Sequence, residues 1–272
     1  MKKEKGLKVF MSIDIEGING ICNWDETEHE EARYEQFRKE LQEEVNAACR
    51  GAIAAGATEI LIKDAHDSAR NLEILDLPEN CSLLRGWEGK PCSMMAGLDE
   101  TFDAVMFVGY HSPSRSDGNS LSHTMNSSRL YEIRINDKIA SEFTINSLYA
   151  SFLGVPVAFL SGDLEMTRLA KEANENIEVV ASKVGVHGAV LSKNPRVTWQ
   201  EIENGAKRGL ENCTKNNLVT LPKHFDIEVA YKYHNLAYNA SFFPGCKLID
   251  TDRISYSSDN YWDCLVMMKF TL

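Results

Sequence analysis

The sequence predicts an α/β fold, with a mainly parallel-sheet α/β core and a smaller C-terminal α+β part. Short apolar runs that end in polar residues recur along the first two thirds of the chain. A stretch with helical periodicity separates the first two runs, and the pattern changes after Ser192. We therefore expect one unit over residues 1–272, with an α/β core over about 7–191 and an α+β subdomain over about 192–272.

The first element pair is a strand over residues 9–13 and a strand over residues 58–66, because both segments are short and apolar. Residues 31–55 lie between them and carry apolar side chains three and four positions apart, as an amphipathic helix does. Gly56 is suited to end that helix. A strand, a helix and a second strand in this order predict a crossover connection and parallel pairing.

Later segments continue the pattern. Apolar runs over 103–111, 154–163 and 177–184 predict three more strands, and a helix follows residue 163. Residues 129–143 alternate and contain the turn pair Asn136–Asp137, which predicts a hairpin or a strand with a turn. Beyond Ser192 we expect a helix over about 198–215, strands near 226–234 and 245–252, and a closing helix over about 259–268.

Composition limits the function classes. The net charge of −11 argues against nucleic acid and anionic membranes as partners. The N-terminal segment is too short and too acidic for a signal peptide or a membrane span, so we expect a cytoplasmic protein. The seven cysteines form no C-x-x-C pair, which suits reduced thiols and offers no zinc–thiolate site.

The segment "VFMSIDIEGINGI" places two carboxylates at the end of the first strand. Side chains two positions apart in a strand point to the same side, so Asp14 and Glu16 are expected to face one place together. Two buried carboxylates repel each other, and burying them unpaired is unfavourable. The positive partner between them is therefore an arginine, a lysine or a metal ion.

Other predicted strand ends carry similar groups. Ligands of open α/β sheets bind at the carboxyl ends of the strands. The second strand ends with Asp64 and His66, the third ends with His111, a glycine- and serine-rich loop leads to His123, and the hairpin segment supplies Glu142. Carboxylate and imidazole together suit Zn²⁺, whereas an all-oxygen set would suit Mg²⁺ or Ca²⁺.

Each of these residues also has a structural interpretation. A single histidine at a strand end is more often a hydrogen-bonded core residue than a ligand. Asp64 is equally suited to a structural turn, and Glu142 to a solvated surface. The recurrence of such groups at successive strand ends favours a metal site. The H-E-x-x-H and G-x-x-x-x-G-K-[ST] motifs are absent, which excludes the single-zinc helix and the P-loop.

Five segments, in their order and separations, carry a resemblance to a known family: "SIDIEG", "KDAH", "GYH", "LSHTM" and "SEFTIN". Together they resemble the M55 metallopeptidases, the DppA-type D-aminopeptidases, over almost the whole chain. The resemblance implies a single M55-like catalytic unit with a two-part α/β subunit. It also implies a self-compartmentalising homodecamer with two zinc ions (Zn²⁺) per subunit.

Position by position, the resemblance implies the metal ligands Asp14, Glu16, His66, His111 and Glu142, with Asp14 bridging two ions. His123 matches the family's catalytic histidine. The segment after Lys183 departs from the family pattern, and so do the loops over 22–35 and 112–120. We expect these two loops to line the entrance of the site.

The implied function is a zinc-dependent aminopeptidase that hydrolyses short peptides with an N-terminal D-amino acid, D-alanyl peptides being the expected substrates. Two alternatives remain from the residues themselves. The first is a dinuclear metal-dependent hydrolase acting on another bond, such as a small amide or a phosphoester. The second is a non-catalytic dipeptide-binding protein, against which His123 argues because binding alone needs no proton-transfer group.

Overall fold

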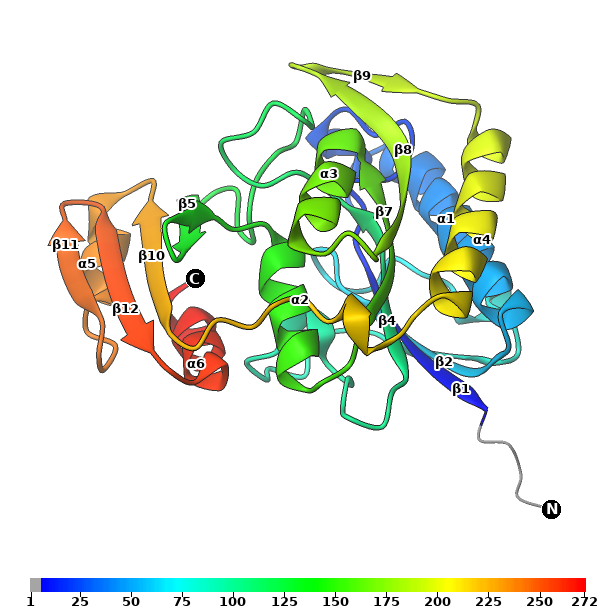
Figure 1. Cartoon of the computed structure of the whole chain (residues 1–272). Helices are drawn as coiled ribbons and strands as arrows, with labels where there is room; N and C mark the ends of the chain where they lie inside the picture. Colours follow the sequence, from blue (N-terminus) through cyan, green and yellow to red (C-terminus); the bar gives the residue numbers. More distant parts are fainter. Residues whose placement is uncertain (1–5) are drawn as a thin grey trace.

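The computed structural model describes residues 6–272 and contains two β-sheets at opposite ends of an elongated molecule (Figure 1). The large sheet has seven strands in the order β3 (Cys81–Leu84), β2 (Ala57–Asp64), β1 (Leu7–Ile13), β4 (Ala104–Tyr110), β7 (Val157–Asp163), β8 (Glu178–Val186) and β9 (Ala189–Ser192). Its strands pair in parallel except β9, which is antiparallel to β8. The predicted α/β class with a mainly parallel sheet is confirmed.

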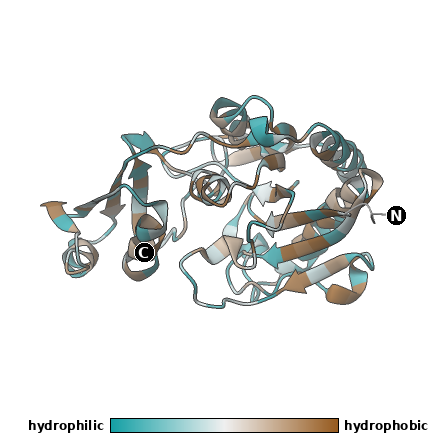
Figure 2. Ribbon diagram, turned by 60° about the horizontal axis from the view of Figure 1, so that its bottom comes forward, coloured by the Kyte–Doolittle hydropathy of each residue, from teal (hydrophilic) through white to brown (hydrophobic). Residues whose placement is uncertain are grey.

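Two layers of helices cover the large sheet. Helices α1 (Tyr34–Ala54) and α4 (Pro195–Glu211) pack side by side on one face, and α2 (Glu142–Phe152) and α3 (Leu164–Ala173) lie on the other (Figure 1). Successive side chains of β1 point to opposite faces of the sheet, so the strand contributes to both cores. Val9 and Met11 join the core beneath α1, and Phe10 joins the core beneath α2. Figure 2 shows hydrophobic residues concentrated in these central strands, as expected for a sheet buried on both faces.

The small sheet is antiparallel. Its strands run in the order β11 (Lys247–Asp250), β12 (Arg253–Ser258), β10 (Phe225–Tyr231), β5 (Leu130–Ile135) and β6 (Lys138–Ile139). Helices α5 (His234–Ala240) and α6 (Tyr261–Thr271) pack against its strands β10 and β12. Residues of this sheet share one apolar core with α2 and with β4 of the large sheet, so the two sheets are joined through α2.

The division between the two sheets does not coincide with the boundary expected near residue 192. The small sheet takes β5 and β6 from the middle of the chain, and α4, which follows residue 192, packs on the large sheet. Sequence patterns describe neighbours along the chain, whereas this exchange of segments depends on long-range pairing of β5 with β10. The separation into an α/β core and an α+β subdomain therefore stays a prediction.

The expected hairpin over 129–143 is present as β5 and β6, and its turn contains Asn136 and Asp137, both with positive φ. The strand pattern does not continue to residue 143, however. Ser141 accepts a hydrogen bond from the backbone N–H of Thr144 and starts α2, whose first residue is Glu142. Glu142 therefore belongs to a helix N-terminus and not to the hairpin. Strand β12 and helix α5 were not predicted.

Candidate metal centre

The segment after β1 is held against the end of β4. The backbone N–H of Asp14 donates to the carbonyl of Val108, and that of Gly17 donates to the carbonyl of Gly109, at 2.9 and 2.8 Å. Both glycines are required by this contact, since a Cβ on Gly17 would lie 1.9 Å from the carbonyl oxygen of Tyr110 and one on Gly109 would lie 2.1 Å from that of Asp14. The two carboxylates of this segment are thus fixed at the carboxyl end of the sheet.

Lys183 is the buried cation nearest to this segment along β8, but it does not neutralise the carboxylates. Its Nζ donates to the backbone carbonyls of Glu16 and Ile21, at 2.5 and 2.6 Å, and so closes the loop between them. Within residues 6–272, no lysine or arginine nitrogen lies within 4.0 Å of the Asp14 or Glu16 carboxylate oxygens. The positive partner expected from the sequence is therefore not a side chain of these two types.

Imidazoles surround the carboxylates instead. His66 Nδ1 lies 3.4 Å from Asp14 Oδ1 and 3.1 Å from Glu16 Oε2. His111 Nε2 lies 3.5 Å from both Asp14 Oδ2 and Glu142 Oε1. Two sets of three potential ligands result, and Asp14 belongs to both, with one carboxylate oxygen directed to each imidazole. All five side chains are buried.

Backbone groups orient these side chains. His66 Nε2 pairs with the carbonyl of Thr27 at 3.0 Å, and His111 Nδ1 pairs with that of Ser112 at 2.9 Å. A carbonyl accepts, so each ring donates from that nitrogen and keeps the other as a lone pair directed at the carboxylates when neutral. The backbone N–H of Met125 donates to Glu142 Oε1 at 2.7 Å. This is the arrangement that metal-ligating side chains have in proteins.

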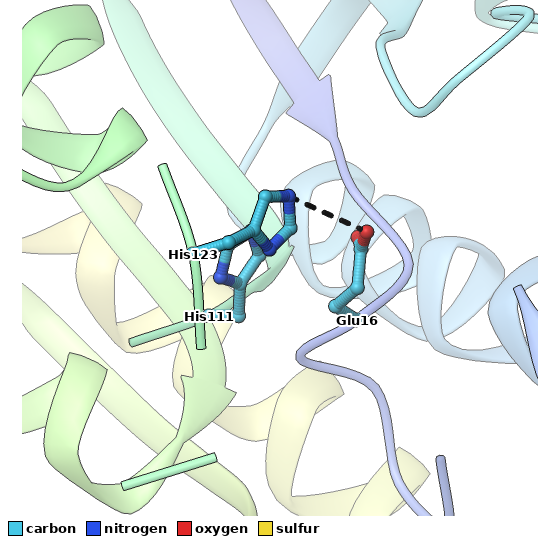
Figure 3. Close-up of side chains that lie close together, drawn as sticks. All are labelled: Glu16, His111 and His123. Carbon is cyan, nitrogen blue, oxygen red and sulfur yellow. Dashed lines mark ion pairs between the residues drawn. The ribbon is translucent and has the colours of Figure 1, made fainter. Parts of the chain in front are cut away.

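His123 joins the same cluster from its loop. Its ring stacks on His111 with the ring centroids 4.3 Å apart and the planes inclined by 10°, and its Nε2 lies 3.9 Å from Glu16 Oε1 (Figure 3). The same nitrogen is 3.8 Å from Glu142 Oε1, and its Nδ1 pairs with the carbonyl of Leu121 at 2.9 Å. His123, Glu16 and His111 form a third set of potential ligands. The histidine thus lies over His111, close to the acids.

The electrostatics follow from burying these charges together. Burial, and then the charges of Glu16 and Glu142, raise the pKa of Asp14 well above its usual value. Burial alone would lower the pKa of His111, but the charges of the three acids outweigh it and raise that pKa to about 10. Burial and the neighbouring His111 lower the pKa of His123. Burial would also lower the pKa of His66, but the charge of Glu16 and the contacts with Asp14 raise that pKa well above its usual value. Without a metal ion, the acids therefore favour protonation of His66 and His111, whereas His123 favours the neutral form.

Three buried atoms of the cluster have no hydrogen-bond partner, namely Asp14 Oδ2, Glu16 Oε2 and His111 Nε2. Buried polar atoms are almost always paired, so each of these points to a missing partner. A cation with carboxylate and imidazole ligands satisfies all three, and this donor mixture suits Zn²⁺. The residues present therefore fit the zinc ions that the resemblance implies.

A cavity of about 780 Å³ opens above the cluster and contains Asp14, Glu16, His66, His123 and Glu142 in its lining. Residues 24 and 27–31 also line it, which confirms that the first of the two divergent loops borders the site. The second, over 112–120, is not among its lining residues. Asp64 takes the structural role, since its carboxylate accepts from the backbone N–H groups of Asn71 and Leu72.

Two aromatic residues of the cavity were not singled out from the sequence. Trp24 packs its ring edge against His123, with centroids 5.2 Å apart. Trp87 donates from Nε1 to the carbonyl of Asp67 at 2.7 Å, and the Lys63 ammonium lies 4.2 Å from its ring centroid. Neither tryptophan stands in a pattern with the ligands, and only the fold brings them there. The one sequence feature that could have drawn attention to them is that each is a large aromatic residue in an otherwise polar loop.

Comparisons with known proteins identify the family of the chain. The sequence model of the M55 peptidases, described as D-aminopeptidase, matches residues 7–270. A D-aminopeptidase of Bacillus subtilis (strain 168) is 29% identical over 246 residues, which cover 89% of this chain and 88% of the relative. The solved structure of the Zn-dependent D-aminopeptidase DppA from Bacillus subtilis, described as a self-compartmentalizing protease, has a TM-score of 0.88 at 27% identity and covers 96% of this chain and 95% of its own. Since the family model spans nearly the whole chain, the protein belongs to the M55 peptidase family of D-aminopeptidases.

Proposed function

We propose that the protein is a zinc-dependent aminopeptidase that removes N-terminal D-amino acids, D-alanine above all, from short peptides. One ion would be held by Asp14, Glu16 and His66, and a second by Asp14, His111 and Glu142. The observation that carries this proposal is the orientation of Asp14, whose two carboxylate oxygens face two different imidazoles at 3.4 and 3.5 Å. The zinc dependence of the structural relative supports it.

When bound, zinc supplies Lewis-acid chemistry, polarising a carbonyl and making water more acidic. The carboxylates of Asp14, Glu16 and Glu142 offer negative charge to the free amine of a substrate and to the cations. All three are buried, and backbone N–H groups of Ile15 and Met125 donate to the Asp14 and Glu142 carboxylates, so these groups need little reorganisation during the reaction.

His123 is the proton carrier in this proposal. Its lowered pKa favours a neutral ring near pH 7, and the contact between Nδ1 and Leu121 places the proton on Nδ1. Nε2 is then free to take a proton from water and to give it to the departing amine. Glu16 and Glu142, each within 4 Å of Nε2, stabilise the ring while it carries that proton.

We extend the proposal to assembly and location. The protein forms a homodecamer in the cytoplasm, with its sites facing an internal space. The self-compartmentalizing relative supports this, as do large exposed aromatic side chains near α5 and α6, including Tyr238, Phe242 and Phe270. Within residues 6–272, no helix combines the length and hydrophobicity needed to cross a membrane. Light scattering that reports a monomer at micromolar concentration would contradict the assembly.

A turnover assay tests the function directly. The zinc-loaded protein should hydrolyse D-alanyl-glycine and leave L-alanyl-glycine largely intact, and chelation followed by added zinc should abolish and restore the activity. Faster hydrolysis of small amides that lack a free amine, or of phosphate esters, would assign a different bond. Full zinc content without turnover of any of these compounds would support a binding protein instead.

A further inference from the structure

A second, smaller cavity adjoins the metal centre. Its volume is about 180 Å³, and it shares Ser93, Met125 and Lys269 with the lining of the large cavity. Among residues 6–272, the sets of potential metal ligands contain neither Lys269 nor any other residue that lines the small cavity. The two cavities are therefore neighbouring compartments of one site.

Helix α2 connects the compartments. Glu142, at its first position, belongs to the metal centre, and Asn146 and Tyr149, four and seven positions later on the same helical face, line the small cavity. The helical rise puts Tyr149 about 10 Å from Glu142 along the axis, a distance that roughly two or three extended peptide residues span. Met125 connects them a second time, since its backbone N–H donates to Glu142 and the residue lines both cavities.

Apolar side chains form much of the wall of the small cavity, which Asn146, Tyr149 and Leu272 also line. Ile145, Leu265 and Met268 contribute to its wall and are each at most 5% exposed. An apolar protein cavity of about 150 Å³ is large enough to hold a benzene molecule. The compartment therefore fits a side chain of the size of leucine or phenylalanine.

A cation stands between the compartments. Lys269 is exposed and lines both of them, and the described ion pairs of residues 6–272 do not include its Nζ. A lysine at the mouth of an apolar cavity matches a group that combines an apolar side chain with a carboxylate. In a dipeptide, the residue after the scissile bond is such a group, whereas the residue before it carries the amine.

We propose that the small cavity and Lys269 bind the residue that follows the scissile bond, so that the preferred substrates are dipeptides of a D-amino acid and an apolar residue with a free carboxylate. The inference rests on the proposed D-aminopeptidase function. Lys269 acts as a specificity-determining residue that pairs with the terminal carboxylate. The side chain of the leaving residue enters the cavity lined by Ile145, Leu265 and Met268.

Three substrates test the proposal on the zinc-loaded wild-type protein: D-alanyl-leucine, D-alanyl-leucinamide and D-alanyl-glycine. We expect kcat/KM for D-alanyl-leucine to exceed that for D-alanyl-glycine by about 10- to 100-fold, the range that apolar groups in such pockets give. We expect the amide to be about 3- to 10-fold poorer than the free acid, because a partly exposed ion pair is lost. The difference should lie in KM, since the carboxylate is bound before and during the reaction.

Variants separate the two parts of the subsite. Lys269→Met should lower kcat/KM for D-alanyl-leucine to the value for the amide and leave the amide unchanged, and Lys269→Arg should retain most of the preference. Lys247→Met, at an exposed lysine of β11, is the matched control. Leu265→Phe, which fills the cavity, and Leu265→Ala, which enlarges it, should change the leucine-to-glycine ratio in opposite directions. Zinc content and thermal unfolding are measured for each variant.

The outcomes distinguish this inference from the function on which it rests. Equal kcat/KM for D-alanyl-leucine and D-alanyl-glycine, or equal losses for acid and amide in Lys269→Met, would overturn the subsite while the aminopeptidase function stands. If D-leucyl-glycine, measured as a fourth substrate, were hydrolysed faster than D-alanyl-leucine and the amide had no effect, the cavity would bind the residue before the scissile bond and the proposal would also be overturned. Absence of turnover of all three dipeptides at full zinc content would refute the function itself.

Discussion

Two buried groups of acids in this molecule are neutralised in different ways. In the small sheet, Glu132 of β5 accepts from Arg134 Nε at 2.9 Å and from an Arg253 guanidinium nitrogen at 3.0 Å. At the carboxyl edge of the large sheet, Asp14 and Glu16 have imidazoles as their ionic partners and leave buried oxygens unpaired. The chain thus pairs Glu132 with arginines, which are always charged, and pairs Asp14 and Glu16 with histidines, which can lose a proton.

This difference indicates which group is built for an external cation. Burial raises the pKa of Glu132, but the bonds from Arg134 and Arg253 outweigh it and keep that pKa low. An arginine cannot give up its proton, so a metal ion could not replace it. An imidazole can, and it then becomes a ligand. The contrast supports a metal centre at Asp14 and Glu16 and a purely structural network around Glu132.

Replacing Asp14 should have the largest effect. Because Asp14 belongs to both ligand sets, Asp14→Ala should weaken zinc binding by more than about 100-fold and abolish turnover. Glu142→Ala removes a ligand from one set and should retain roughly one ion per chain. Elemental analysis after dialysis measures both. Full zinc occupancy in the Asp14 variant would show that this residue is no ligand.

Replacing His123 should separate chemistry from metal binding. His123→Ala should keep the zinc and lose roughly 10²- to 10⁴-fold in kcat, the usual contribution of a proton-transfer group. KM for D-alanyl-glycine should change little, because the variant keeps the carboxylates and the zinc ions that bind the substrate amine. Loss of zinc from this variant would make His123 a ligand, and a near-normal kcat would require another proton carrier.

The two acid groups should respond oppositely in the metal-free protein. Glu132→Gln should lower the free energy of unfolding by about 1–3 kcal/mol, because Arg134 and Arg253 lose their charged partner. Asp14→Asn should raise it by about 1 kcal/mol at pH 8, since the fold raises the pKa of Asp14 and makes its ionisation unfavourable. Denaturant unfolding of chelated samples measures both. A stabilising Glu132→Gln would remove the contrast.

Glu44 offers a smaller, pH-dependent test away from the ligands. Burial raises the pKa of Glu44 to about 8, and the charge of Glu40 on the same helix adds to the rise. The hydrogen bond from the backbone N–H of Asn19 and the charge of Lys183 on β8 lower this pKa, but they do not outweigh burial. The folded state therefore holds a proton that the unfolded chain releases above about pH 4.5, and stability contributed by Glu44 is lost as pH rises towards 8.

Glu44→Gln imitates the protonated acid and should flatten that decline. At pH 5 the variant and the wild type should be about equally stable. At pH 8 the variant should be more stable by an amount on the order of 2 kcal/mol. Urea unfolding at both pH values provides the comparison, with Glu43→Gln, at a half-buried neighbour on α1, as the control. Parallel pH profiles of wild type and Glu44→Gln would contradict this origin of the dependence.

The sequence predicted the parts of this molecule that local patterns determine. The parallel strands and α1 follow from apolar runs and helical spacing, and the grouping of Asp14, His66 and His111 follows because parallel strands end at the same edge. Glu142 was placed on the wrong element, since one hydrogen bond from Thr144 to Ser141 decides where the helix begins. Strand alternation gave no sign of that bond.

Other features depend on contacts between distant segments. The sequence gives no indication that Lys183 reaches back to the carbonyls of Glu16 and Ile21, or that Trp87 approaches Asp67. The exchange of segments between the sheets is of the same kind, because β5 finds its partner about 90 residues later in β10. Periodicity cannot specify such pairings, which are set by packing in three dimensions.

The central claim is that the acids at the edge of the large sheet bind two zinc ions through a shared Asp14. A crystal of the zinc-loaded protein, with anomalous-difference maps measured above and below the zinc absorption edge, tests this most directly. We predict two zinc peaks per chain, one between Asp14, Glu16 and His66 and one between Asp14, His111 and Glu142, and none near Glu132. A single peak, or two peaks that do not share Asp14, would contradict the account.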